Sequence, residues 1–404
     1  MDYSFKYGRL AYDLEVPAYS RLIKVSSPGG GPDREAFMQE LDSRLKPGIA
    51  SAGIVVSDKT RSCDYHKLLP WVISGLRRRI SDDEAIKVYI AYGTHPKQTE
   101  RESLKIYGDI FNRYEFIHHN CDETGNMITR GHTSRGTPVT VRKDIFDHDQ
   151  LILLGAVSHH YFAGYGGGRK LLFPGLAERQ AIYSNHSLFI DFAKMSLDQG
   201  CGPGMLAGNP VAEDLLEADR MMPEKIIISG IPDDRGNVSR ILFAGSYDEF
   251  LPACALYDEY YRKYGEKEYD NVIASAGGYP KDINFIQAHK SLHNAASFVK
   301  DGGRLIMLAE CTDGIGNEGF LNIFSGSKQE IFEGLKKQYS GNGGTALSLL
   351  AKTERINISM LTRLSSRTCN TLNIRKLSLP ELKSELAGLR GSTAIIGNAG
   401  IVYR

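Results

Sequence analysis

Short runs of apolar residues alternate with helical stretches along most of the chain, and this alternation constrains the fold more than any other feature. Three such runs occur at 52–58 (AGIVVSD), 85–95 (AIKVYIAYGTH) and 150–160 (QLILLGAVSHH). Helical periodicity follows the first two, at 68–80 and 99–111. Strands separated by helices are typical of α/β domains with a mainly parallel sheet. We therefore expect an α/β protein.

A second α/β unit is predicted after a hydrophilic stretch at 262–270 (RKYGEKEYD). A strand at 271–278, a helix at 282–300 and a strand at 304–311 would form a βαβ crossover of the usual size. We expect Asp-Gly-Gly at 301–303 to end the helix. This second unit should resemble a Rossmann domain.

Length and composition agree with two globular domains, which we expect at 1–265 and 271–404. The chain has 404 residues and a formal net charge of +1, so no electrostatic feature points to nucleic acid. No apolar run approaches the roughly 18 residues that a membrane span needs. Six cysteines without a CxxC pair, and a start without a secretory signal, predict a cytoplasmic protein with reduced thiols.

Polar side chains follow each of the first three expected strands. Asp58, Thr60 and Arg61 follow the first, His95 ends the second and His160 ends the third. The carboxyl ends of parallel strands meet at one edge, where ligands bind, so we expect an active-site cleft between the two domains. Each residue alone has a simpler explanation, such as a turn histidine or a surface arginine. Their convergence on one edge favours a catalytic site.

The stretch after the third strand, SHHYFAGYGGGRKLLFPG (158–175), combines glycines with a lysine. It fails the P-loop pattern, which needs Gly-Lys followed by Ser or Thr. Backbone N–H groups of Gly166, Gly167 and Gly168 can still bind a phosphate, although a flexible loop would explain the glycines equally well. Lys170 precedes an apolar segment. Desolvation there would lower its pKa and make it a nucleophile or an attachment point.

Two further places offer imidazoles to a metal. His186 would need other ligands, from elsewhere in the chain or from a cofactor. His289 and His293 share one helix face, but the glutamate of the HExxH pattern is missing. Gln287 and Lys290 lie on the same helix, where the helix dipole and the lysine favour a carboxylate or phosphate.

Several motifs between about residues 58 and 320 resemble, in order and spacing, those of the nickel-dependent lactate racemase family. They are SDKTR, GTH, HYFAGYGGGRK, an Asn-His pair, GNPV, GGYP followed by IQAHK, and ECTDGIGNEGF. The broader members of this family are 2-hydroxyacid racemases and epimerases.

The resemblance implies a covalent cofactor. The lysine matching Lys170 carries a nickel pincer nucleotide, pyridinium-3-thioamide-5-thiocarboxylic acid mononucleotide, through a thioamide bond. His186 matches the histidine that completes the nickel coordination. The glycines at 166–168 would accept the cofactor's phosphate, and Asp58 and Thr60 belong to a motif that supports this pocket.

The resemblance also implies the catalytic roles. His95 and His160 match two histidines that act as alternating acid and base. Arg61, Gln287 and Lys290 match positions that bind the substrate. Hydride transfer avoids a carbanion beside a carboxylate, because the substrate passes through a 2-keto acid that accepts the hydride back on its other face.

Departures from the family pattern bear on the substrate and the partners. Ile286 stands where lactate-acting members have a tyrosine. Trp71 is the only tryptophan, so the C-terminal tryptophan of the lactate-acting members is missing. These differences favour a 2-hydroxyacid other than lactate, such as a sugar acid. Cofactor-maturation proteins are expected partners, and a second copy of the chain is a possible one. Binding to nucleic acid or to a membrane is not expected.

Two other functions are alternatives. A nicotinamide-dependent 2-hydroxyacid oxidoreductase would need a GxGxxG motif after a strand, which we do not find. A family member without cofactor would act as a binding protein. A zinc hydrolase is a further alternative, but the sequence lacks its ligand cluster.

Overall fold

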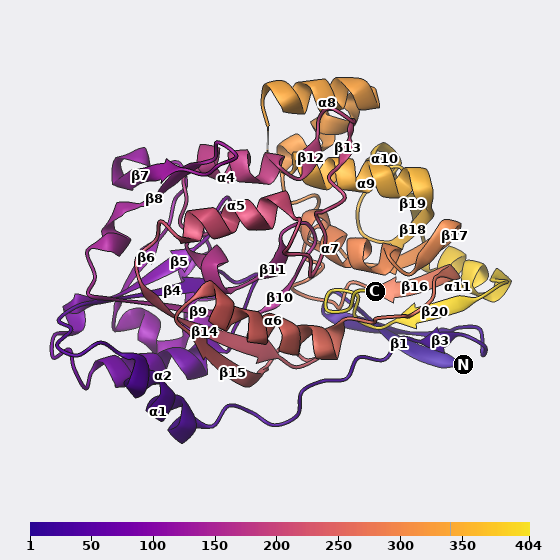
Figure 1. The fold of residues 1–404 in the computed structure, drawn as a ribbon. Coiled ribbons are helices and arrows are strands. Elements are labelled where there is room, and N and C mark those ends of the chain that lie inside the picture. Colours follow the sequence, from indigo (N-terminus) through magenta and orange to yellow (C-terminus); the bar gives the residue numbers. More distant parts are fainter. Residues whose placement is uncertain (340) are drawn as a thin grey trace. The chain divides into compact units, whose positions relative to one another are not determined.

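Two six-stranded, mainly parallel sheets organise the part of the chain that the computed structural model describes, residues 1–339 and 341–404 (Figure 1). This confirms the expected α/β class. Each sheet belongs to its own unit of the chain. Unit 1 comprises Met1–Ser26, Phe189–Asp198 and Tyr261–Arg404, and unit 2 comprises Ser27–Leu188 and Gln199–Tyr260.

The units interleave along the chain, so they differ from the expected domains 1–265 and 271–404. The first 26 residues belong to unit 1 because β3 (Arg21–Leu22) pairs with β20 (Thr393–Ile396) in one sheet. The hairpin of β1 (Asp2–Tyr7) and β2 (Leu10–Glu15) buries Phe5 against the apolar face of that sheet. Pairing between the two ends of a chain leaves no trace in local periodicity.

The unit 2 sheet has the strand order β15-β14-β9-β4-β5-β6, and only the β14–β15 pair is antiparallel. Its strands are β4 (Ala52–Ser57), β5 (Ile86–Ala91), β6 (Glu115–His118), β9 (Gln150–Ala156), β14 (Lys225–Pro232) and β15 (Val238–Ala244). Every residue of β4 is buried, as expected for a central parallel strand that is covered on both faces.

Helices and two hairpins complete unit 2. The helices are α1 (Arg34–Arg44), α2 (Tyr65–Leu76), α3 (Glu100–Tyr107), α4 (Arg179–Ser187), α5 (Pro210–Asp219) and α6 (Tyr247–Tyr261). The hairpins are β7 (Met127–His132) with β8 (Pro138–Arg142), and β10 (Ser158–His160) with β11 (Gly164–Gly166). Short 3-10 turns lie at Asp83–Ala85, Gly108–Asn112, Thr124–Asn126, Lys143–Phe146 and Gly168–Leu171.

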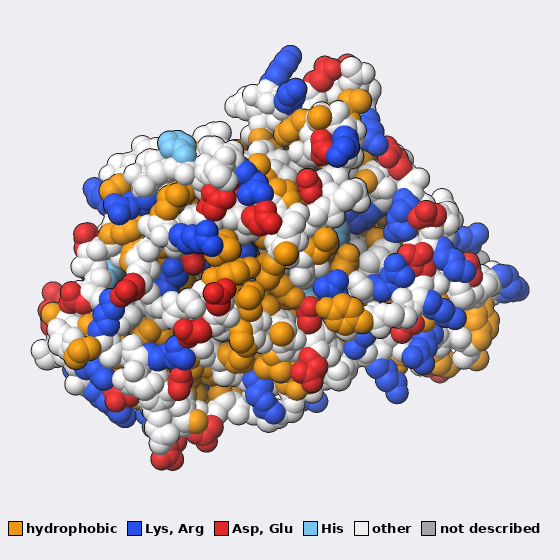
Figure 2. All heavy atoms as spheres, in the orientation of Figure 1, with side chains coloured by type: hydrophobic (Ala, Val, Ile, Leu, Met, Phe, Trp, Pro, Cys, Tyr) orange, Lys and Arg blue, Asp and Glu red, His pale blue; other side chains and the backbone are white. Residues whose placement is uncertain are grey.

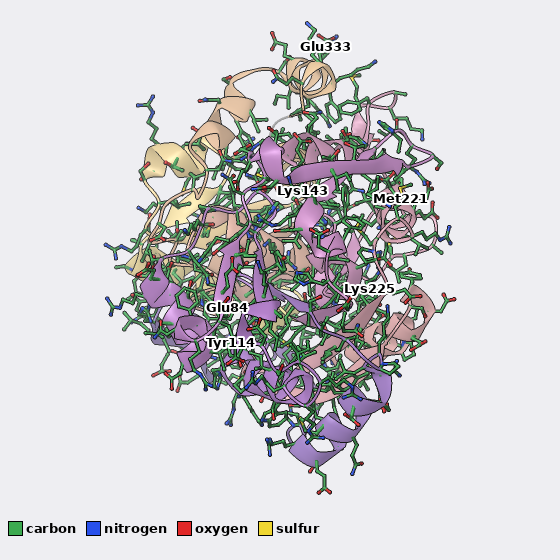
Figure 3. The ribbon with its side chains drawn as sticks, turned by 90° about the vertical axis from the view of Figure 1, so that its left-hand side faces the viewer. Glu84, Tyr114, Lys143, Met221, Lys225 and Glu333 are labelled. Carbon is green, nitrogen blue, oxygen red and sulfur yellow. The ribbon has the colours of Figure 1, made fainter. Side chains whose placement is uncertain are left out.

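An ion pair joins the end of α5 to the start of the neighbouring strand in unit 2. Lys225, labelled in Figure 3, lies 2.8 Å from Oδ1 of Asp219, and both side chains are less than a tenth exposed. The pair fixes how α5 meets β14.

The unit 1 sheet has the strand order β19-β18-β17-β16-β20-β3 and is parallel throughout. Its other strands are β16 (Tyr269–Ser275), β17 (Val299–Leu308), β18 (Asn357–Leu361) and β19 (Arg375–Leu377). The remaining elements are β12 (Ile190–Asp191), β13 (Ser196–Leu197), α7 (Phe285–Ala296), a 3-10 helix (Glu318–Ser325), α8 (Lys328–Lys337), α9 (Gly343–Arg355), α10 (Ser366–Thr371) and α11 (Leu379–Gly388).

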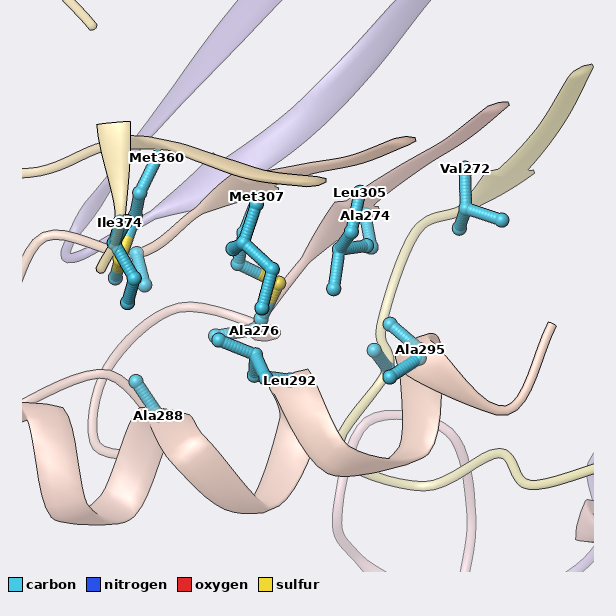
Figure 4. Packing of buried hydrophobic residues seen from close by; sticks show 14 of the residues in the cluster. Val272, Ala274, Ala276, Ala288, Leu292, Ala295, Leu305, Met307, Met360 and Ile374 are labelled. Carbon is cyan, nitrogen blue, oxygen red and sulfur yellow. The ribbon is translucent and has the colours of Figure 1, made fainter. Parts of the chain in front are cut away.

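One core cluster of unit 1 lies between the sheet and α7, and another packs β1, β2 and α11 against the sheet. Figure 4 shows Leu292 and Ala295 of α7 beside apolar side chains of the strands, among them Leu305 and Met307. Alanines at the helix surface let the helix approach the sheet closely, which favours dense packing.

The expectation that Asp-Gly-Gly at 301–303 ends the helix is wrong, because these residues lie inside β17. The helix ends at Ala296, and Val299 already pairs with Tyr269. The register shifts beyond that pair, and Gly302 has a φ of 74°. The glycines therefore belong to a β-bulge within the strand. Glycine is favoured at such a bulge as well as at a helix end, because both can require a positive φ.

Positively and negatively charged side chains are mixed over the face shown in Figure 2, in agreement with the near-neutral net charge. Among the helices described, none combines the length and the apolar character that crossing a bilayer requires.

Candidate functional site

The candidate site lies at the carboxyl edge of the unit 2 sheet. β4, β5 and β9 are neighbours and run parallel, so the segments that follow them emerge at the same edge. Most of the polar side chains predicted from the sequence are on these segments.

Asp58 and His95 form a hydrogen-bonded pair. Oδ2 of Asp58 lies 2.6 Å from Nδ1 of His95, and Asp58 is only 3% exposed. Burial opposes ionisation of this carboxyl. The charge and hydrogen bond of His95, together with two bonds from Thr60, outweigh burial and hold the pKa of Asp58 well below its usual range. An ionised carboxylate at Nδ1 fixes the ring proton there and leaves Nε2 as the basic nitrogen.

A turn after β4 places Thr60 and Arg61 beside this pair. Oδ1 of Asp58 accepts the Thr60 N–H at 2.9 Å and the Thr60 hydroxyl at 2.6 Å, an arrangement typical of Asx turns. The Arg61 guanidinium makes no hydrogen bond or ion pair with the residues the structure describes. An unpaired, partly buried guanidinium is suited to binding a carboxylate.

Gly166 is needed for Arg61 to lie where it does. A Cβ at Gly166 would be 2.7 Å from Nη1 of Arg61. At the next position, Gly167 has a φ of 81°, and a Cβ there would be 2.6 Å from the carbonyl oxygen of Ala156. A larger residue at Gly166 would displace the Arg61 guanidinium, and one at Gly167 would displace the backbone at the end of β9.

The hairpin after β9 carries two histidines with different partners. Nε2 of His159 lies 2.6 Å from Oδ1 of Asp258. His160 is buried, and its Nδ1 accepts the backbone N–H of Ala163 at 3.3 Å. Successive strand residues point to opposite faces, so the two imidazoles have separate environments.

Lys170 and His186 meet at the ring of Phe162. The Lys170 ammonium lies 5.8 Å from the ring centroid, and the His186 ring lies 5.0 Å from it. Burial, followed by the positive charges of Lys170 and Arg61, lowers the pKa of His186 to about 3. The imidazole is therefore neutral at physiological pH, the form that can ligate a metal.

Atoms of both residues are buried. Nζ of Lys170 is shielded from solvent, as expected from the apolar segment that follows it. Nδ1 of His186 is also buried, and it finds no hydrogen-bond partner among residues 1–339 and 341–404. A buried polar atom without a partner is costly, so a bound group at this place is physically reasonable.

Gln287 and Lys290 are brought together on α7 of unit 1. Nζ of Lys290 donates to Oε1 of Gln287 at 2.7 Å, and Asn284 caps the helix by accepting the N–H of Gln287. On the same helix, burial lowers the pKa values of His289 and His293 well below normal. No group of three or more His, Cys, Asp or Glu residues suited to a metal occurs in the described part of the chain.

Sequence reasoning missed the network that supports the helix carrying His186. The buried Asn185 donates to Oδ2 of Asp214 at 2.8 Å, and Oδ1 of Asp214 accepts the hydroxyl of Thr133 at 2.5 Å. Asp214 is fully buried on α5. The available signal was its position on the apolar face of that helix, three residues after Val211. Asp258, the partner of His159, is 99 residues away and gave no local signal.

Comparison with known proteins identifies relatives of this chain. A model of the lactate racemase N-terminal domain matches residues 37–197, and a model of the lactate racemase C-terminal domain matches residues 265–341. Together these matches cover more than half of the chain.

Two curated relatives are lactate racemases. The protein from Thermoanaerobacterium thermosaccharolyticum is 31% identical over 285 residues, which are 70% of this chain and 65% of that protein. The protein from Lactiplantibacillus plantarum is 32% identical over 278 residues, which are 68% of this chain and 64% of that protein. The match thus spans slightly less than two thirds of each relative.

Two solved structures share the fold. The lactate racemase apoprotein from T. thermosaccharolyticum gives a TM-score of 0.86 at 24% identity, with both chains covered completely. A protein from Thermotoga maritima gives a TM-score of 0.72 at 16% identity, covering 93% of this chain and 99% of that one. With both domain models matched in order, this chain belongs to the lactate racemase family.

Proposed function

We propose that this protein is a nickel-dependent racemase or epimerase that inverts C2 of a 2-hydroxyacid other than lactate, such as a sugar acid. The observation that carries the proposal is the hydrogen bond at 2.6 Å between the buried Asp58 and the partly exposed His95, on the sheet edge that also bears the unpaired Arg61. Two curated relatives named lactate racemase support the reaction class.

The residues beside this pair fit a covalently attached nickel pincer nucleotide. The amine of Lys170 is shielded from water, and the buried Nδ1 of His186 finds no partner in the described structure. Lys170 would carry the cofactor and His186 would ligate its nickel. Backbone N–H groups of Gly166, Gly167 and Gly168 are suited to its phosphate. When bound, this cofactor accepts a hydride from C2 of the substrate and returns it.

The chain's own side chains supply proton transfer and substrate binding. His95, held by Asp58 through Nδ1, has Nε2 to take the proton of the C2 hydroxyl. We assign His160 the matching role for the opposite configuration, since inversion requires an acid or base on each side of the substrate. Because its Nδ1 accepts the Ala163 N–H, the neutral ring carries its proton on Nε2 and starts as the acid. Arg61 binds the substrate carboxylate with its planar fork, and Gln287 and Lys290 also bind the substrate.

The substrate is expected to differ from lactate because of one position before Gln287. Ile286 packs against the hydrophobic core of unit 1, where lactate-acting members have a tyrosine. This change removes a phenol hydroxyl from the site. We further propose a cytoplasmic location and a dependence on cofactor-maturation proteins.

The test is peptide mass spectrometry combined with nickel quantification on protein co-expressed with the maturation enzymes. We expect an adduct on the peptide that contains Lys170, near-stoichiometric nickel, and inversion of an aldonate faster than of lactate. Lys170→Arg should lose the adduct, whereas Lys143→Arg, at an exposed lysine, should keep it. An unmodified Lys170 without nickel would refute the cofactor. Net keto-acid formation that depends on added NAD would favour an oxidoreductase.

A further inference from the structure

The carboxyl edge of the unit 1 sheet carries charged groups that the proposed reaction does not use. β16 has β17 on one side and β20 on the other, so the strand order reverses between β16 and β20 (Figure 1). In open parallel sheets, ligands bind beyond the carboxyl ends of the strands at such a reversal. The segments 276–284 and 397–400 follow these two strands.

Lys281, in the first of these segments, is held by the second. Its Nζ donates to Oδ1 of Asn398 at 3.3 Å. A Cβ at Gly277 would lie 3.2 Å from Cδ of Lys281, and one at Gly400 would lie 2.9 Å from the same atom. The aliphatic part of the lysine therefore passes between two glycines, which fixes the position of its ammonium group.

Lys6 brings a second positive charge to this place. It lies near the end of β1, and a Cβ at Gly278 would be 3.2 Å from its own Cβ. Burial, and secondly the charge of Lys6, lower the pKa of Lys281 to about 8. Within residues 1–339 and 341–404, neither lysine forms an ion pair with a carboxylate. Two neighbouring cations without a counter-charge repel each other, and a bound anion would relieve that repulsion.

The nearby carboxylates do not pair with the two lysines. Oδ2 of Asp282 accepts the N–H groups of Gly8 at 2.7 Å and of Glu310 at 3.2 Å. The carboxylate of Glu310 lies 3.6 Å from the Arg363 guanidinium. Oδ1 of Asp282 is buried without a hydrogen-bond partner in the described part of the chain, and neither carboxylate forms an ion pair with Lys6 or Lys281.

Backbone donors complete the arrangement. The N–H groups of Gly278 and Asn398 have no hydrogen-bond partner in the described structure. A phosphate group carries a charge of about −1.5 to −2 at neutral pH and has three strong acceptor oxygens. We propose that this edge of unit 1 binds a phosphate group, either free or carried by a larger molecule, through Lys6, Lys281 and the N–H of Gly278.

The experiment is calorimetric titration of the purified full chain with inorganic phosphate at low ionic strength and pH 7. Lys6→Met and Lys281→Met should each weaken binding by about tenfold, because each removes one charge-assisted contact. Lys300→Met is the matched control, since Lys300 pairs with Asp270 near the start of β16, at the opposite edge. It should bind phosphate as the unaltered chain does.

A second variant guards against local unfolding of the lysine variants. Asn398→Asp keeps the size of the side chain but sets a carboxylate at Nζ of Lys281, so it should abolish phosphate binding while circular dichroism stays unchanged. Absence of saturable binding to the unaltered chain, or full binding to Asn398→Asp, would overturn the proposal.

The source of the phosphate is distinguished by two further titrants. Tighter binding of glycerol 3-phosphate than of inorganic phosphate would assign the site to a phosphate ester, and equal affinity would assign it to free phosphate. Acetate binding as tightly as phosphate would refute a phosphate site. These readouts need neither nickel nor turnover, so they are independent of the proposed racemase activity.

Discussion

Replacing Asp58 by Asn tests how His95 is oriented. Oδ1 of Asp58 accepts two hydrogen bonds from Thr60, so an asparagine would keep its carbonyl oxygen there and turn its NH₂ group toward His95. That NH₂ group can only donate, whereas Nδ1 of His95 now shares a proton with Oδ2 at 2.6 Å. The ring proton would move to Nε2, and the nitrogen proposed as the base would lose its lone pair.

The expected loss follows from this change of tautomer. The equivalent exchange in the catalytic triad of serine proteases lowers kcat by about 10⁴. We expect about 10³ to 10⁴ here, which corresponds to about 4 to 5.5 kcal/mol of transition-state stabilisation. The forward and reverse kcat/KM values are linked by the equilibrium constant, so both directions should fall by the same factor.

The assay is chiral chromatography of the product in both directions, with nickel content measured on the same samples. Asp122→Asn, at an exposed carboxylate paired with Arg179, is the control and should keep full activity. Nickel content should be unchanged in Asp58→Asn, which would show that the loss of turnover is not caused by loss of the cofactor. An Asp58→Asn enzyme that retains more than about a tenth of kcat would refute the assigned role of the pair.

Three further perturbations test other parts of unit 2. In urea unfolding, Gly167→Ala should lower the free energy of unfolding by at least about 2 kcal/mol more than Gly136→Ala. Both glycines have a φ of 81°, but only a Cβ at Gly167 would clash with the carbonyl oxygen of Ala156. Equal losses of stability would contradict this steric clash. Burial lowers the pKa of His119 from 6.5 to about 4. As pH drops from 6.5 to 4, His119 is therefore protonated in the unfolded chain before it is protonated in the folded chain, and the free energy of unfolding falls. Between pH 7 and 5 this amounts to about 2 kcal/mol, and His119→Asn should remove that much of the pH dependence of unfolding. Arg61→Lys should raise KM about 10- to 100-fold with a smaller change in kcat, because an ammonium cannot bind a carboxylate in bidentate fashion; an unchanged KM would exclude Arg61 from substrate binding.

The buried parallel strands could be predicted from the sequence with little error. The runs at 52–58, 85–95 and 150–160 correspond to β4, β5 and β9, because strands covered on both faces must be apolar along their length. The residues that follow them could be predicted to meet at one edge, since parallel strands share their direction. The neighbourhood of Asp58, His95 and Arg61 follows from that rule.

Other features required contacts between distant parts of the chain. The Asn185–Asp214 and His159–Asp258 pairs join residues 29 and 99 positions apart, and no local pattern specifies such partners. The glycines at 302 and 303 fit a helix end as well as a bulge, and only the pairing of β17 with β16 decides between them.

The α/β class, five of the strands in the two six-stranded sheets and the residue types that follow them can be predicted from the sequence, because burial and local hydrogen bonding act over a few residues. That the first 26 residues belong to unit 1, and that Lys6 therefore lies beside Lys281, follows from the folded chain alone. Contacts between residues as far apart as Lys6 and Lys281 depend on chain closure and on packing of the whole unit, which no short stretch of sequence encodes.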